Sequence, residues 1–194
     1  MKQTSDGLFQ HPGLRALLVK LRLPLFVVVL VLLAPFVQRE WLLAGFVVSM
    51  FGLFIQTWCF ASLDKNTTLT IRGPYTMVRN PMYLGRFFIP LGFLMLLGQW
   101  WLLLAYAVVY WLYMDARVQR EEAHLKPIFG APYAEYLTQV RRFVPGWPQA
   151  GKQVGYWNAA LFSQNHATRN VLATLAAWAL MTAWALWGVP MLRG

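Results

Sequence analysis

Residues 41–61 read WLLAGFVVSMFGLFIQTWCFA, an apolar run in which no side chain is charged. A helix needs about 20 residues to cross about 30 Å of hydrocarbon, so this run is long enough to span a membrane by itself. A second run of sufficient length occupies residues 171–192. Together the two runs predict an integral membrane protein built from helices.

The composition of the whole chain supports the same class. Of its 194 residues, 58% are hydrophobic and 12% are charged, which leaves too little polar surface to cover a soluble globule of this size. The one cysteine, Cys59, lies inside the first apolar run. A disulfide framework is therefore excluded, and a buried, inert thiol is expected.

Three shorter apolar segments, at residues 23–37, 82–97 and 100–114, complete the pattern. Only Gly98-Gln99 separates the last two, which predicts a tight helical hairpin. We therefore expect one all-α membrane domain over residues 1–194, with about five transmembrane helices. Residues 72–145 hold the polar motifs, and residues 146–194 form a linker and an additional C-terminal transmembrane helix.

The basic residues predict how these helices are oriented. Fifteen of the 17 lysines and arginines precede the first span, lie between Lys65 and Arg86, or lie between Arg117 and Arg169. Five crossings place these three groups on one side, so we expect the N-terminus and the polar motifs in the cytoplasm and the C-terminus opposite. This distribution explains the net charge of +10, and no nucleic-acid partner is expected.

The first polar block, residues 72–85, reads RGPYTMVRNPMYLG. Pro74 and Pro81 interrupt helix propagation, so the backbone between them should be irregular and should offer unpaired N–H and C=O groups near the membrane interface. A polar cofactor with adenine, ribose and carboxylate groups is one partner for such a backbone. The alternative is a loop that only caps two helices, with Arg79 reaching a lipid phosphate.

The second polar block, residues 117–125, reads RVQREEAHL and follows directly on an apolar span. Arg117 and Glu121 have the i, i+4 spacing of an ordinary surface pair. They also begin at the membrane edge, where a charged ligand would sit. The spacing alone leaves both readings open.

An amphipathic helix is predicted farther on, because residues 133–143 repeat with a helical period. Its apolar face would be formed by Tyr133, Tyr136, Leu137, Val140 and Phe143. Its polar face would be formed by Glu135, Gln139, Arg141 and Arg142. Such a helix would lie on the membrane or close over a site.

The order of these motifs resembles the isoprenylcysteine carboxyl methyltransferase family. The elements that carry the resemblance are Gly-Pro-Tyr, Val-Arg-Asn-Pro-Met-Tyr-Leu-Gly, an apolar hairpin, Arg-x-x-x-Glu-Glu, Phe-Gly-x-x-Tyr and Arg-Arg-Phe-Val-Pro, from Arg72 to Pro145. Its members are integral membrane enzymes that bind S-adenosylmethionine at the cytoplasmic face and methylate lipophilic substrates reached from the bilayer. Related phospholipid N-methyltransferases share this core. The resemblance implies the same cofactor and a lipophilic acceptor here.

Carried over by position, the resemblance implies a cofactor site between the loop before the third helix and the helix that follows the fourth. The implied cofactor-binding residues are Tyr75, Val78, Arg79, Asn80, Tyr83, Leu84, Glu121 and Glu122. Arg117 and Glu122 match the catalytic pair of the family. Asn80 stands where the family usually has His; Asn keeps a donor and an acceptor but does not titrate near neutrality, so a contact is expected there without a proton relay.

The implied chemistry leaves the acceptor open. The sulfonium methyl group is already activated, so the protein must chiefly align an acceptor and exclude water. A carboxylate needs no base, and Arg117 could hold it with two hydrogen bonds, whereas an amine would need Glu121 or Glu122 as a base. Arg117 and Glu122 lie about 140° apart on an ideal helix. Either cofactor and acceptor occupy different sides of this helix, or the helix unwinds near Gln119.

Three functions therefore remain open. The first is methylation of an isoprenylcysteine-like carboxylate or another lipid-borne polar group. The second is N-methylation of a phospholipid or S-methylation of a small thiol. The third, of another class, is a non-catalytic membrane scaffold or lipid-binding protein. No cluster has the spacing of metal ligands, so no metal is expected. Alanines in the last span leave the oligomeric state undetermined.

Overall fold

The structure is a computed structural model that describes residues 32–65, 68–148 and 151–193, together with residues 21, 24 and 28. Within these ranges every regular element is helical and no strand is present, as the all-α prediction requires. Seven of the 15 residues of the first predicted span, residues 23–37, lie outside the described residues. The elements in chain order are η2 (Ala34–Phe36), η3 (Arg39–Trp41), α2 (Leu42–Ser62), η4 (Gly73–Thr76), α3 (Pro81–Met95), α4 (Trp100–Gln139), α5 (Ala159–Gln164), α6 (Ala167–Ala183), η5 (Trp184–Gly188) and α7 (Val189–Arg193).

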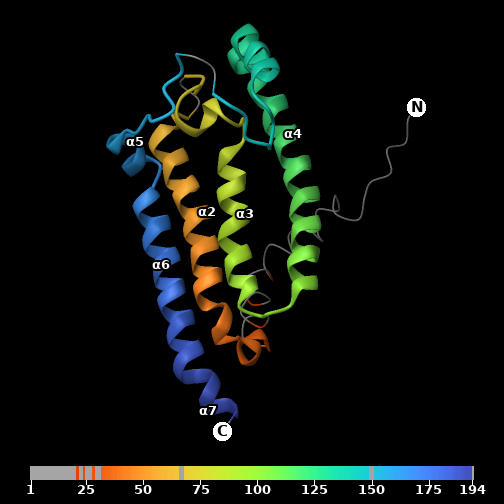
Figure 1. The fold of residues 1–194 in the computed structure, drawn as a ribbon. Coiled ribbons are helices and arrows are strands. Elements are labelled where there is room, and N and C mark those ends of the chain that lie inside the picture. The colour runs from red at the N-terminus through yellow and green to blue at the C-terminus, as the bar shows by residue number, and fades with distance from the viewer. Residues whose placement is uncertain are drawn as a thin grey trace, which may run out of the picture.

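The long helices α2, α3, α4 and α6 run along one common direction (Figure 1). The loop with η4 and the short helix α5 lie at the end drawn uppermost, which we call the upper end; α7 lies at the opposite, lower end. The backbone between Pro74 and Pro81 holds only the 3-10 turn η4, so the prediction of irregular backbone there is confirmed. Proline fits the first position of a helix, and α3 begins at Pro81.

Glycines allow α2 and α3 to touch through their backbones. Gly45 faces Gly92, and Gly52 faces Gly85. A Cβ atom built on Gly52 would lie 2.8 Å from the carbonyl oxygen of Gly85, which is closer than side chains pack. Between these contacts the Ser49 hydroxyl donates to an α3 carbonyl oxygen at 2.7 Å. Small residues of this kind are typical of helix pairs that pack in a membrane.

The predicted hairpin between the third and fourth spans is confirmed. The helix α3 ends at Met95 and α4 begins at Trp100, and Gly98 between them has a φ of +62° that favours glycine. The helix α4 does not end with its apolar run, however, but continues to Gln139. Only Gly130, with φ 57° and ψ −134°, leaves helical geometry inside it, so the helix does not unwind near Gln119.

The prediction for residues 133–143 is wrong in part. Tyr133 and Tyr136 are buried and Glu135 is exposed, as expected, but the helix ends before Val140, whose ψ of 133° is extended. Arg142 does not join the solvated face, because acidic side chains on α4 attract it. That attraction outweighs the helical period after residue 139.

Two described helical stretches are long and apolar enough to cross a membrane: Arg39–Ser62 and Ala167–Leu192. The second combines α6, the π-helical stretch η5 and α7. The helix α3 is apolar but shorter. These features are consistent with a membrane protein by length and composition, and they fall short of a count of five spans.

The lower end of the bundle is fastened by Trp178, Phe93 and Arg39. Trp178 on α6 is buried and stacks on Phe93 of α3, with ring centroids 4.5 Å apart. The Arg39 guanidinium donates to the carbonyl oxygens of Ala185 and Leu186 at 2.8 and 2.6 Å. Arg39 thus binds backbone carbonyls of the π-helical stretch and ties the last helix to the start of α2.

Candidate active site

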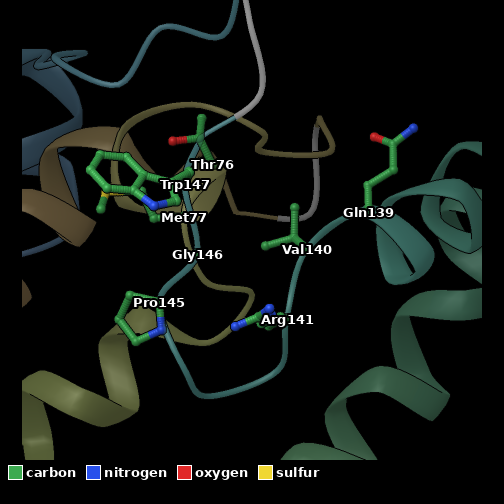
Figure 2. Close-up of a pocket in the computed structure, with 8 residues that line it drawn as sticks. All are labelled: Thr76, Met77, Gln139, Val140, Arg141, Pro145, Gly146 and Trp147. Carbon is green, nitrogen blue, oxygen red and sulfur yellow. The ribbon is translucent and has the colours of Figure 1, made fainter.

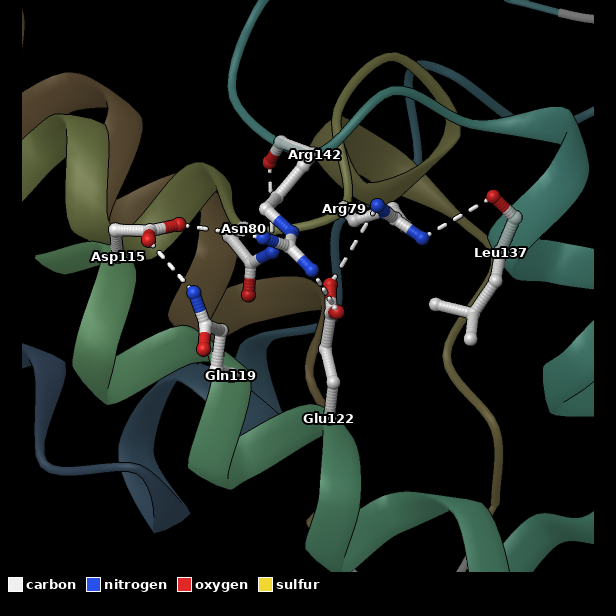
Figure 3. A network of polar contacts seen from close by, with 7 residues as sticks. All are labelled: Arg79, Asn80, Asp115, Gln119, Glu122, Leu137 and Arg142. Carbon is white, nitrogen blue, oxygen red and sulfur yellow. Dashed lines mark hydrogen bonds and ion pairs between the residues drawn. The ribbon is translucent and has the colours of Figure 1, made fainter.

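Glu122 is the centre of the polar contacts at the upper end. It projects from α4 and is buried, with 6% of its surface exposed. Its Oε2 accepts a hydrogen bond from Arg142 Nη2 at 2.8 Å, and its Oε1 lies 3.6 Å from Arg79 Nη2 (Figure 3). A buried carboxylate is stable only when cations or donors surround it, and here two arginines from two different loops do so.

Arg142, which follows α4 in the chain, also binds a second carboxylate on that helix. Its Nη1 lies 3.2 Å from Oδ1 of Asp115, and Gln119 donates to the other oxygen of Asp115 at 2.7 Å. The side chain of Asn80 donates to the carbonyl oxygen of Arg142 at 3.4 Å (Figure 3). The hydrogen bond to Glu122 raises the pKa of Arg142. Asp115, Gln119 and Glu122 form one strip of α4, because residues at i, i+4 and i+7 share a face.

Two buried polar atoms in this network lack a hydrogen-bond partner among the described residues. They are Arg79 Nε and Glu122 Oε1. The rest of Arg79 is fixed, since its Nη1 donates to Leu137 O at 3.1 Å and its backbone N–H donates to Arg141 O at 2.9 Å. Buried polar atoms without a partner are rare in proteins and call for an explanation. A ligand with one anionic and one cationic group would satisfy both.

A second strip of α4 carries Arg117 and Glu121. The Tyr83 hydroxyl donates to Glu121 Oε2 at 2.7 Å, and the Tyr83 carbonyl accepts from the Tyr110 hydroxyl at 2.7 Å. Arg117 is exposed, and the Tyr83 hydroxyl beside it raises its pKa. Arg117 and Glu122 therefore lie on different sides of a regular helix, and the unwinding near Gln119 that the second alternative required is absent.

The two strips are separated by a small apolar cluster. Tyr83, Met114 and Val118 are its buried members, and Phe143 packs against them. Val118 is completely buried. Tyr83 thus connects the apolar cluster with the strip of Arg117 and Glu121, since its ring packs in the cluster and its hydroxyl binds Glu121.

The remaining predicted residues lie beneath or beside this centre. Tyr75 is buried and its carbonyl oxygen accepts a hydrogen bond from the Tyr136 hydroxyl at 2.8 Å. Burial raises the pKa of Tyr75 well above its usual value. Val78 is buried in the same loop, and Leu84 is half-buried on α3. Tyr75 and Val78 support the loop by packing.

A pocket opens beside this loop, on the side of Arg141. Its volume is about 660 Å³. Figure 2 draws the residues that line it: Thr76, Met77, Gln139, Val140, Arg141, Pro145, Gly146 and Trp147. Backbone hydrogen bonds of 2.9 Å from Arg79 to Arg141 and of 2.8 Å from Gly146 to Met77 hold its two walls together. None of the predicted site residues lines it. Arg79 follows the lining residue Met77 by two positions, and Arg142 follows the lining residue Arg141 directly.

Comparison with known proteins gives this geometry a context. A profile of the phospholipid methyltransferase family matches residues 41–132. The protein-S-isoprenylcysteine O-methyltransferase of Schizosaccharomyces pombe is 37% identical over 82 residues, which are 42% of this chain and 35% of that protein. The protein-S-isoprenylcysteine O-methyltransferase B of Arabidopsis thaliana is 33% identical over 82 residues, 42% of each chain. The Xenopus laevis protein-S-isoprenylcysteine O-methyltransferase is 33% identical over 78 residues, 40% of this chain and 27% of that protein. No solved structure matches the chain significantly.

The chain is similar to the isoprenylcysteine and phospholipid methyltransferases. The methyltransferase resemblance predicted from the sequence motifs is thereby confirmed. The chain matches about two fifths or less of the length of these relatives. The family profile places the similarity in residues 41–132. All the predicted site residues lie inside the matched residues 41–132.

Sequence reasoning missed Arg142 and Asp115 as site residues. Arg142 follows the matched region, and the helical period assigned it to a solvated face. Asp115 precedes the quoted Arg-x-x-x-Glu-Glu motif by two residues, at the end of an apolar span. Asp115 and Glu122 lie two turns apart on one face of α4. This spacing could have predicted that the two carboxylates bind one cationic side chain.

Proposed function

We propose that this protein is a membrane methyltransferase that uses S-adenosylmethionine and methylates an isoprenylcysteine-like carboxylate on a lipophilic acceptor. The observation that carries the proposal is a pair of buried atoms without a hydrogen-bond partner among the described residues, Arg79 Nε and Glu122 Oε1. Both residues lie within residues 41–132, which match the phospholipid methyltransferase family.

The residues at this centre fit the charged end of the cofactor. S-adenosylmethionine ends in an α-carboxylate and an α-ammonium group, and the site offers one donor and one acceptor with unused capacity. Arg79 would bind the carboxylate through Nε, and Glu122 would bind the ammonium through Oε1. Charge-assisted hydrogen bonds of this kind are about twice as strong as neutral ones. Asn80, which already donates to Arg142 O, would keep Arg142 against Glu122.

The acceptor would lie on the strip of Arg117 and Glu121. Arg117 is exposed on α4 directly above an apolar stretch of this helix, in which Val109 and Tyr113, eight and four residues earlier and nearest to the side of Arg117, are also exposed. A lipid tail would lie along these side chains while its carboxylate reaches the guanidinium, which can hold two oxygens at once. An exposed apolar surface of this kind is normal in contact with lipid and unusual in water.

Tyr83 would mark the point of transfer, because it lies between the two strips. The bound cofactor supplies a methyl group on a sulfonium, which a nucleophilic oxygen takes with release of S-adenosylhomocysteine. Arg117 would orient that oxygen. The cluster of Tyr83, Met114 and Val118 would exclude water, and the hydrogen bond from Tyr83 to Glu121 would hold the ring in place. A carboxylate acceptor needs no base, so Glu121 would act only through Tyr83.

The membrane setting of the proposal includes several passes and a cytoplasmic site. The upper end of the bundle carries Arg72, Arg79 and Arg142, whereas Arg39 lies at the lower end and is bound to carbonyl groups. Positive charge favours the cytoplasmic side. The described helices with sufficient length and hydropathy support membrane insertion, and the five-helix arrangement itself is part of the proposal.

The test is a methyl-transfer assay with purified protein in lipid nanodiscs. S-adenosylmethionine labelled in its methyl group is supplied with N-acetyl-S-farnesylcysteine, and the matched control is the carboxamide of the same acceptor. We expect a base-labile methyl ester with the acid and no transfer to the amide. Failure of the wild-type protein to bind S-adenosylhomocysteine, or binding without transfer to any lipid acceptor, would contradict the proposal and favour a scaffold.

A phospholipid amine is the second candidate acceptor, because the profile that matches residues 41–132 is that of phospholipid methyltransferases. An amine must lose a proton, and Glu121 beside Tyr83 would then be the base. Phosphatidylethanolamine nanodiscs distinguish the two. Base-stable label in the phospholipid, with none in the farnesylated acid, would replace O-methylation by N-methylation.

A further inference from the structure

The segment from Gly151 to Asn165, which we call the C-terminal strap, folds back onto the upper end of α2 (Figure 1). It consists of an irregular stretch followed by α5. The strap lies outside residues 41–132, so the family match assigns it no role. Its contacts join two parts of the molecule: the end of α2 and the loop that carries Arg79.

The strap caps α2. A helix leaves its last four carbonyl groups without a partner inside the helix. The Asn165 side chain donates to Phe60 O at 2.9 Å, and the backbone N–H of Asn158 donates to Ala61 O at 3.0 Å. Arg72 Nε donates to the final carbonyl of α2 at 3.1 Å. The strap and the segment of Arg72 therefore both cap the C-terminal end of α2, which holds them beside each other.

The strap also contacts the start of the loop that carries Arg79, at residues 72–73. The carbonyl oxygen of Tyr156 accepts hydrogen bonds of 3.2 Å from two α2 side chains, which holds Tyr156 on the helix. The ring of Tyr156 lies 4.2 Å from the Arg72 guanidinium carbon, and the Gly73 N–H donates to Gln153 O at 2.8 Å. Gly73 has a φ of +58°, and a Cβ atom there would collide with the Ser62 hydroxyl. The loop thus starts from a narrowly defined conformation.

Beyond this start, the loop is held from its other side. Tyr136 donates to Tyr75 O, and the backbone of Arg79 donates to Arg141 O. These contacts come from α4 and from the segment that follows it. The strap, together with the carbonyl oxygen of Ser62 at the end of α2, fixes residues 72–73, six to seven residues before the arginine that faces Glu122.

We propose that the C-terminal strap is a positioning element of the cofactor site, in which the ring of Tyr156 and the guanidinium of Arg72 fix the loop that carries Arg79. This inference rests on the proposed function for the identity of its ligand. The proposed site assigns neither residue a contact with the cofactor or the acceptor. The attraction between a cation and an aromatic ring needs the ring and not the hydroxyl, so phenylalanine should replace tyrosine and an aliphatic residue should not.

The test compares Tyr156→Leu and Tyr156→Phe with Trp157→Leu. Trp157 is the neighbouring aromatic residue of the strap; it is 52% exposed and pairs with Phe162 inside the strap. Isothermal titration with S-adenosylhomocysteine should give a Kd about fivefold higher for Tyr156→Leu, equivalent to about 1 kcal/mol. The KM for S-adenosylmethionine should rise equally while kcat changes less than about twofold. Tyr156→Phe and Trp157→Leu should match the wild type.

Hydrogen exchange separates this inference from the proposed function. Backbone amides of residues 73–79 should exchange faster in Tyr156→Leu than in the wild type, with or without ligand, and at the wild-type rate in Trp157→Leu. If the wild type binds no S-adenosylhomocysteine, the proposed function fails and exchange alone decides the role of the strap. Should Tyr156→Leu not fold, Arg72→Gln against Arg72→Lys makes the same comparison. Unchanged exchange and Kd in the ring-deleting variants, or equal losses in Trp157→Leu, would overturn the proposal.

Discussion

Replacement of Glu122 and Arg142, singly and together, measures the strength of the contact that organises the upper end. Glu122 Oε2 and Arg142 Nη2 are 2.8 Å apart, and the two side chains are 8% and 34% exposed. Breaking a fully buried pair costs about 3–5 kcal/mol, because one charge stays buried without a partner. Because the Arg142 side chain is partly exposed, water screens part of the charge and reduces this cost. We therefore expect Glu122→Gln and Arg142→Gln each to lower the free energy of unfolding by about 2–3 kcal/mol.

The double variant should lose less than the sum of the two single losses. We expect a coupling energy of about 1.5–3 kcal/mol, as for close charged pairs. Unfolding in mixed micelles titrated with dodecyl sulfate, followed by tryptophan fluorescence, supplies the four free energies. The matched control is the same cycle with Glu121→Gln, since Glu121 accepts its hydrogen bond from Tyr83 and not from Arg142. Its coupling to Arg142 should stay below about 0.5 kcal/mol. A coupling that small for Glu122 itself would refute the reasoning, because it is the value of a solvated surface pair.

Three further predictions test other parts of the molecule. Gly52→Leu should strongly lower the melting temperature in detergent, because its Cβ alone would lie 2.8 Å from Gly85 O. The control Gly155→Ala, which has open space around it, should leave the melting temperature unchanged. Equal melting temperatures for the two variants would contradict the close α2–α3 packing. Burial raises the pKa of Tyr133 to about 12, above the usual value of about 10, so its contribution to stability is present below pH 10 and is lost as the pH rises toward 12. Tyr133→Phe should flatten that alkaline fall in melting temperature, and an unchanged slope would count against it. Arg117→Ala should abolish transfer to a carboxylate acceptor while the Kd for S-adenosylhomocysteine changes less than about threefold, since Arg117 lies on the other strip; a loss of cofactor binding would disprove the assignment of two strips.

Much of the local architecture follows from the sequence. The uncharged run at residues 41–61 corresponds to α2, Gly98-Gln99 to the hairpin turn, and Asn80-Pro81 to the start of α3. These features depend on hydrophobic length and on the backbone restrictions of glycine and proline, which act within a few residues. The motifs also indicated that Arg79, Asn80 and Glu122 belong together, and the structure brings them into one network.

The parts that escaped prediction depend on contacts between distant segments. Arg142 left the expected amphipathic helix because Asp115 and Glu122, 27 and 20 residues earlier, offered it two carboxylates. A helical period records only neighbours along one helix and carries no information about such partners. The same holds for Asn165, whose amide caps α2 by donating to two carbonyl oxygens 105 and 102 residues earlier along the chain. Its sequence surroundings look like an ordinary linker.

The most direct test of the cofactor centre compares two ligands, one with and one without the amino-acid chain that bears the charged end. S-adenosylhomocysteine carries the α-carboxylate and α-ammonium groups, and 5′-methylthioadenosine lacks both. Titration calorimetry on the purified wild-type protein and on Glu122→Gln gives four dissociation constants. If Arg79 Nε and Glu122 Oε1 bind the charged end, the wild type should prefer S-adenosylhomocysteine by about tenfold or more. The preference should fall in Glu122→Gln, which loses the contact with the ammonium group but keeps Arg79 for the carboxylate. Equal affinities in the wild type, or a preference that survives the substitution unchanged, would contradict the account.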